Sequence, residues 1–122
     1  MTDDLITWLR AQLDADERVA RAATPGPWVW LAGRVFQEHG DDRIVVPTVN
    51  DLAVVEPEDL AHIARHDPAR VLAEVQAKRR LVSEAEHYLN YEDHGLPLAE
   101  WILTFLALPY ADVPGYRDEW RP

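Results

Sequence analysis

The segment RAATPGPWVW, residues 21–30, constrains the fold of this chain more than any other stretch. Because Thr24 precedes a proline, its backbone is pushed out of the helical region, so a helix arriving from the N-terminus must end there. The Pro25-Gly26 pair suits a tight turn. Pro27 has no backbone N–H, which is tolerated at the first residue of a strand but not in its middle. The segment therefore predicts a helix end, a sharp reversal and the beginning of a strand.

Two tryptophans follow the reversal at alternate positions of the expected strand. Trp28 and Trp30 point to one face, because successive side chains of a strand alternate between faces. We expect this pair to hold the sheet against a helix; the alternative is an aromatic platform for a ligand, which needs an open face with polar partners.

A second junction lies where Asp67 precedes Pro68. The residues that we expect to fix these two junctions are Pro25, Gly26, Pro27, Trp28, Trp30, Asp67 and Pro68.

Hydrophobic periodicity and helix-stop residues predict four helices. Two of them begin with a proline that suits the first helical position, Pro57 in a short helix and Pro68 in a long one. Asp67 is placed to cap the long helix. The four helices are expected over residues 3–23, 57–66, 68 to a stop near Gly95, and about 97–108.

Between the first two helices, apolar runs and turn signals predict a small antiparallel sheet. The first strand is expected to begin at Trp28, the second to include Val35-Phe36 and the third to cover residues 43–49. Residues 50–56 are expected to form a linker. The fold class is therefore α+β: an N-terminal helix, a small antiparallel sheet of about three strands, then a helix, a long helix and an apolar C-terminal helix. The length of 122 residues indicates a single domain over 1–122.

The last expected helix is unusual because it is apolar nearly all round. Only Glu100 and Thr104 are polar between Leu98 and Leu108. Such a helix is either central in a core or covered by another chain, and a chain of this size has little room for a fully central helix. We expect the tail after it to pack back on the surface. A homodimer interface is the alternative to burial, with candidate interface residues Leu98, Trp101, Ile102, Phe105 and Leu106.

The charge of the chain excludes some partners and favours others. Twelve Lys and Arg residues against 22 Asp and Glu residues give a net charge of −10. Phosphates repel such a chain, so direct nucleic-acid binding is not expected, and a protein partner with a basic surface is favoured. The longest apolar run falls short of the roughly 20 residues that a membrane span needs. With an acidic N-terminus unlike a signal peptide, we expect a cytoplasmic protein and no membrane partner.

No catalytic or cofactor-binding residue stands out, and no cofactor is expected. There is no cysteine, and the one serine, Ser83, has no nucleophile-elbow context. His62 and His66 lie four residues apart on one helix face, a spacing that binds zinc when a third ligand such as Asp59 or Asp67 converges. The alternative is that His62 packs or hydrogen-bonds at the helix–sheet junction, while His66 lies near the helix C-terminus, where its cation is favoured.

Three stretches carry a resemblance to a known family: LITWLRAQLDADERVARAATPGPWVW, AHIARHDPARVLAEVQAKRR over 61–80, and LALPYADVPGYRDEWRP over 106–122. With these motifs, which cover most of its length, the chain resembles a family of small actinobacterial and phage-associated proteins classed as a domain of unknown function, the 6221 type. The family has no established activity, so the resemblance implies no catalytic residues. Many relatives carry Cys and His residues before the LALPYA segment, in some at a spacing that could hold a metal, and this chain has no cysteine there.

These observations leave three hypotheses for function. The leading one is a non-enzymatic, acidic accessory protein, linked to phages or mobile elements, that binds another protein through its acidic surface or its apolar last helix. In a sharper form, the acidic surface mimics nucleic acid and occupies a basic groove. The alternatives are a metal-binding module or metal-dependent enzyme that uses the His62 and His66 face, and a homodimer with a structural role only.

Overall fold

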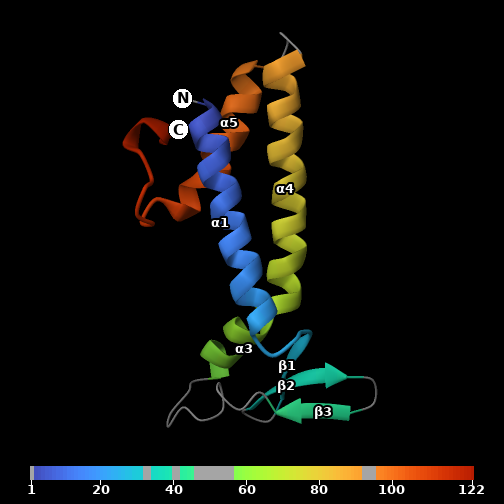
Figure 1. The fold of residues 1–122 in the computed structure, drawn as a ribbon. Coiled ribbons are helices and arrows are strands. Elements are labelled where there is room, and N and C mark those ends of the chain that lie inside the picture. Colours follow the sequence, from blue (N-terminus) through green and yellow to red (C-terminus); the bar gives the residue numbers. More distant parts are fainter. Residues whose placement is uncertain (1, 32–33, 40–41, 46–56, 92–95) are drawn as a thin grey trace. The chain divides into compact units, whose positions relative to one another are not determined.

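A computed structural model gives the fold of the chain (Figure 1). It describes residues 2–31, 34–39, 42–45, 57–91 and 96–122. The elements in chain order are α1 (Thr2–Ala22), β1 (Trp28–Leu31), β2 (Arg34–His39), β3 (Asp42–Val45), α3 (Pro57–Arg65), α4 (Pro68–Tyr91), α5 (Leu96–Ala107) and two 3-10 turns, η1 (Leu108–Tyr110) and η2 (Asp118–Trp120). The predicted α+β class, with the predicted order of helices and strands, is confirmed. No helix in the described ranges is long and apolar enough to cross a membrane.

The boundaries predicted from prolines and periodicity lie close to the observed boundaries of the helices and strands. β1 begins at Trp28, directly after Pro27, and the carbonyl of Pro27 accepts a hydrogen bond from the Glu38 N–H at 2.9 Å. The strand predicted over 43–49 is described only in part, because β3 covers Asp42–Val45 and the remainder lies outside the described residues. The linker predicted over 50–56 also lies outside them.

Close contacts group the chain into two compact units. Unit 1 comprises Met1–Ala15 and Val75–Pro122, and unit 2 comprises Asp16–Glu74. Helices α1 and α4 therefore contribute residues to both units. The single domain expected over residues 1–122 stays a prediction.

The core of unit 1 is formed by one face from each of three helices. The N-terminal part of α1, the C-terminal part of α4 and α5 lie alongside one another (Figure 1). Arg10 on α1 makes two hydrogen bonds of 3.0 Å to the Glu86 carboxylate on α4, and Arg79 lies 2.7 Å from Asp14. These ion pairs flank an apolar interior. Its buried side chains are Leu5, Ile6, Leu9, Leu13, Val75, Val82, Ala85, Ala99, Leu103, Ala107 and Trp120.

The C-terminal tail contributes one buried side chain, Trp120, to this core. Trp120 is 2% exposed, and its ring lies 5.3 Å from the ring of Trp8 on α1, with Tyr116 beside both. Gly115 has a φ of +95°, and a Cβ atom there would lie 2.8 Å from Nε1 of Trp8. The tail therefore turns through a glycine, because a side chain at this positive φ would also clash with the indole of Trp8. The expectation of a surface-packed tail is wrong for Trp120.

Unit 2 contains a three-stranded antiparallel sheet in the order β1-β2-β3. The register pairs Trp30 with Val35, so these two side chains and Trp28 share one face. Val35 and Leu60 of α3 form a small buried cluster, and Trp28 packs against it. Of the tryptophan pair expected to hold the sheet against a helix, Trp28 takes that place, whereas Trp30 remains 41% exposed.

Candidate functional site

An apolar stripe runs along the outer side of α5 and continues into η1. Its members are Leu98, Trp101, Phe105 and Leu108, which are 59%, 56%, 57% and 40% exposed. Their spacing of three, four and three residues aligns them on one helix face. The opposite face of α5 carries residues that are buried in the core of unit 1, Ala99, Leu103 and Ala107. The helix is apolar all round because one face forms the core and the other lies open to solvent.

The stripe extends onto the neighbouring helix α4. Leu81 and Tyr88, seven residues apart, are 44% and 46% exposed. They line a hollow of about 250 Å³ together with Leu98, Ile102 and other residues of the two helices. We call the six exposed side chains the apolar face: Leu81, Tyr88, Leu98, Trp101, Phe105 and Leu108.

The five residues predicted as an interface differ in their exposure to solvent. Leu98, Trp101 and Phe105 are exposed, whereas Ile102 and Leu106 are half-buried at its edge. Sequence reasoning missed the contribution of α4. The available signal was the seven-residue interval between Leu81 and Tyr88, which places both outside the buried stripe of that helix.

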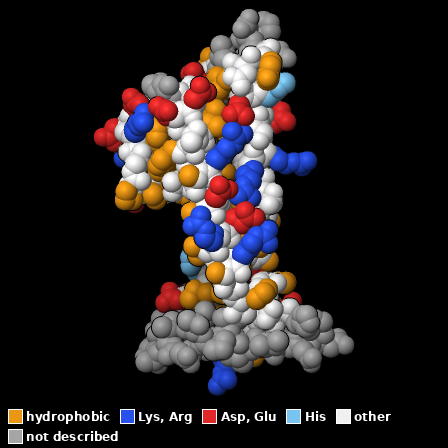
Figure 2. Space-filling view, viewed as in Figure 1, with side chains coloured by type: hydrophobic (Ala, Val, Ile, Leu, Met, Phe, Trp, Pro, Cys, Tyr) orange, Lys and Arg blue, Asp and Glu red, His pale blue; other side chains and the backbone are white. Residues whose placement is uncertain are grey.

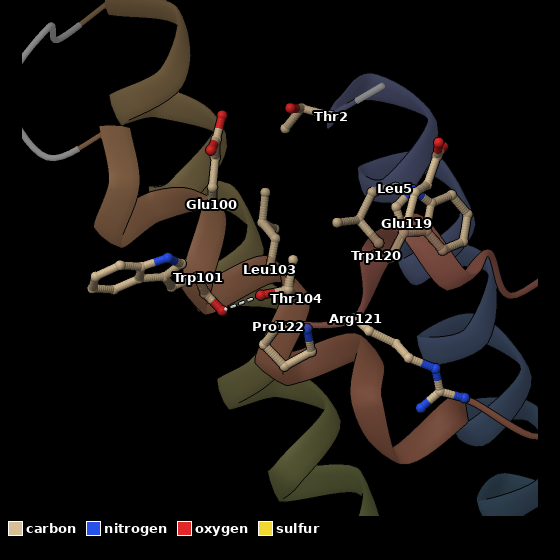
Figure 3. A pocket seen from close by; sticks show the side chains of 10 residues that line it. All are labelled: Thr2, Leu5, Glu100, Trp101, Leu103, Thr104, Glu119, Trp120, Arg121 and Pro122. Atoms are coloured by element: carbon tan, nitrogen blue, oxygen red, sulfur yellow. Dashed lines mark hydrogen bonds between the residues drawn. The ribbon is translucent and has the colours of Figure 1, made fainter.

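A second hollow, of about 240 Å³, lies on the other side of the stripe. Figure 3 shows its lining, which comes from α5, the start of α1 and the C-terminal tail. The indole of Trp101 points away from Leu5 and Trp120, and the hydroxyl of Thr104 donates to the Trp101 carbonyl at 2.9 Å. The indole of Trp101 is therefore exposed between the two hollows, and an exposed tryptophan is a side chain that often carries binding energy in protein contacts.

The junction residues of unit 2 serve a different purpose. The carboxylate of Asp67 is buried, and it accepts the N–H of Trp28 at 2.6 Å and that of Arg70 at 2.8 Å. One side chain thus caps α4 and holds the start of β1. A Cβ atom on Gly26 would lie 2.8 Å from the Asp67 carboxylate and 2.7 Å from the Cβ atom of Ala69, so only glycine fits there.

The other predicted junction residues are less involved. Pro68 is buried at the beginning of α4, whereas Pro25 and Pro27 are exposed. The indole N–H of Trp28 donates to the Thr24 carbonyl at 2.9 Å. The structure therefore brings together Gly26, Trp28, Asp67 and Pro68 at this junction.

The candidate metal ligands do not converge in unit 2. The His62 and His66 rings lie 4.4 Å apart and both are exposed, and Nδ1 of His66 lies 3.0 Å from the His62 carbonyl. Asp59 is exposed, and Asp67 is occupied by the backbone N–H groups of the junction. In the described part of the chain, no three His, Cys, Asp or Glu side chains are grouped so that they could hold a metal ion.

Charges of both signs are mixed along the helices. On the face seen in Figure 2, acidic and basic side chains alternate over α1 and α4 without forming one continuous acidic patch. Several of these charges are paired: besides the two bridges between α1 and α4, Arg117 of the tail lies 3.1 Å from Asp4. These ion pairs neutralise some of the acidic side chains locally, within a chain whose net charge is −10.

Comparison with known proteins identifies the family to which these motifs belong. No curated protein and no solved structure matches the chain. The family model that matches extends over residues 2–122, and so includes the Gly26 junction, the apolar face and the tail. The chain belongs to DUF6221, a family of unknown function.

Proposed function

We propose that this chain is a non-enzymatic protein-binding module that holds its partner on the apolar face. The supporting observation is that Trp101 and Phe105 are more than half exposed beside Leu98, on a helix whose other face is buried. Monomeric proteins rarely leave several large apolar side chains contiguous in water, and such patches mark interaction sites. Tryptophan and other aromatic residues are also the side chains that most often carry binding energy at interfaces.

The polar groups of the described residues favour binding over catalysis. Asp67 is the only charged side chain that is buried in those ranges, and both its oxygens accept backbone N–H groups. A catalytic acid or base needs an environment that perturbs it beside an open cleft. The linings of the two hollows beside the apolar face include Glu84, Glu100 and Glu119, and all three are exposed.

The character of the partner follows from the rim of the apolar face. The linings of the two hollows include the carboxylates of Glu84, Glu100 and Glu119, but Arg121 lines one of them and Glu119 lies 3.6 Å from Arg117. A foreign partner would therefore present apolar anchors, with a basic side chain opposite Glu84 or Glu100. An accessory role in phages or mobile elements, which rests on the resemblance of the sequence motifs, and a cytoplasmic location are both parts of the proposal. On the face seen in Figure 2, acidic and basic groups are mixed over α1 and α4, so this face gives no support to mimicry of nucleic acid.

The test is capture of a partner by the tagged chain from nuclease-treated lysate of its host. Wild type is compared with Trp101→Glu and with Val19→Glu, a matched control because Val19 is 72% exposed on α1 and outside the apolar face. The proposal predicts a stoichiometric protein, a second copy of the chain included, that Val19→Glu retains and Trp101→Glu loses. Retention of the same partner by Trp101→Glu would show that binding occurs elsewhere on the chain.

A further inference from the structure

We propose that the occupant of the apolar face is a second copy of this chain, which makes the protein a two-fold symmetric homodimer. The inference rests on the proposed function, because it names the partner of the same face. In a two-fold dimer the same patch is used by both copies, so it must be complementary to itself. Three properties of the apolar face meet that requirement: its spacing, its charge and its area.

The spacing of the stripe is self-complementary. Leu98, Trp101, Phe105 and Leu108 repeat at intervals of three and four residues, the pattern with which one helix packs lengthwise on another. When two α5 helices lie antiparallel, Trp101 of each copy faces Phe105 of the other, and Leu98 faces Leu108. The central contacts are then two pairs of aromatic rings, which prefer edge-to-face or offset packing. A foreign partner would need its own stripe with this spacing, whereas a second copy carries it already.

The charges near the stripe favour the antiparallel arrangement. Glu100 is the only charged residue between Leu96 and Ala107. In an antiparallel pair centred on the stripe, the two Glu100 residues are about 9 Å apart along the axis, at 1.5 Å rise per residue. A parallel pair would bring them level with each other. The stripe itself carries no charge, so repulsion between two chains of net charge −10 acts at longer range and is weakened by salt.

The area of the apolar face is close to what a stable dimer needs. The exposed fractions of its six side chains add to roughly three fully exposed large side chains, on the order of 600 Å². Standard interfaces bury about 800 Å² on each partner. The half-buried residues at the edge, Ile102 and Leu106, together with the polar rim, can supply the difference.

The experiment is sedimentation velocity on the purified full chain, over a concentration series up to about 0.5 mM, which detects weak specific contacts. The inference predicts a monomer–dimer equilibrium that tightens as salt is raised, because screening reduces repulsion between acidic copies. Trp101→Glu and Phe105→Glu should each raise the dimer dissociation constant at least about 30-fold, the effect of a central interface residue. Val19→Glu should leave it unchanged, and circular dichroism establishes that each variant is folded.

Failure of the dimer inference and failure of the proposed function give different experimental results. A wild-type chain that remains monomeric at every concentration and salt overturns the second copy as occupant. The proposed function survives that result if a different protein is still captured in a Trp101-dependent manner. A dimer that persists in both folded glutamate variants, or that weakens as salt is raised, also overturns the inference, since it places the contact elsewhere or gives it another physical origin. Should Trp101→Glu fail to fold, Phe105→Glu decides the question at an independent exposed position.

Discussion

Replacement of Asp67 by alanine should destabilise unit 2 strongly, because one buried carboxylate holds two separate backbone groups. Its oxygens accept the N–H of Trp28 at 2.6 Å and the N–H of Arg70 at 2.8 Å. Hydrogen bonds to a charged group contribute about 1.5–3 kcal/mol each, and loss of a helix cap alone costs about 0.5–2 kcal/mol. Asp67→Ala should therefore lower the free energy of unfolding by about 3–4 kcal/mol. The loss also leaves the Trp28 N–H without its acceptor in the junction.

Graded variants at this position test the reasoning more sharply than a single deletion. Asp67→Asn keeps one acceptor oxygen, and its cost should be about half that of alanine, ~1–2 kcal/mol. Asp67→Ser can still cap α4, but its shorter side chain should not reach the Trp28 N–H. Asp118→Ala, at a side chain that is 95% exposed, is the control and should cause no measurable change. Urea unfolding followed by tryptophan fluorescence gives the four values, and the reasoning is refuted if alanine costs less than ~1 kcal/mol.

Three further predictions concern single positions. Gly26→Ala should destabilise the chain by about 1–3 kcal/mol in thermal unfolding, because the new Cβ would lie 2.7 Å from the Cβ atom of Ala69; a neutral result would mean that the backbone can give way. Gly115→Ala should cost about 1–3 kcal/mol, since it combines a φ of +95° with a contact of 2.8 Å to Nε1 of Trp8, and an unchanged melting temperature would contradict this. His62→Ala should leave the zinc content measured by mass spectrometry unchanged, because no third ligand converges on it in the described ranges; a loss of stoichiometric zinc would restore the metal hypothesis.

The sequence predicts the elements of this fold well because their boundaries depend on local chemistry. Pro57 and Pro68 begin α3 and α4 as their fixed backbone angle predicts, and Thr24 before a proline lies just beyond the end of α1. The role of Gly26 is different, because a turn preference describes the residue in isolation. In the structure, the lack of a side chain on Gly26 leaves room for the carboxylate of Asp67, the cap of α4, which lies 41 positions further along the chain. Sequence periodicity carries no information on such a contact.

The sequence predicts the apolar character of the candidate site, but not which side of α5 faces solvent. An all-round apolar helix does not reveal which half forms the core. The structure buries the side with Ala99 and Ala107, whose small side chains allow close approach to neighbouring helices, and exposes Trp101 and Phe105. The burial of Trp120 was missed for a related reason, since it depends on Trp8 at the other end of the chain.

The most direct test of the central claim compares the mass in solution of wild type and Trp101→Glu, side by side at the same concentration and at two salt concentrations. Trp101 is 56% exposed at the centre of the apolar face, so the substitution should remove association without unfolding the chain. The account predicts a dimer for wild type, more complete at the higher salt, and a monomer for the variant under both conditions. An identical mass for the two proteins would contradict it.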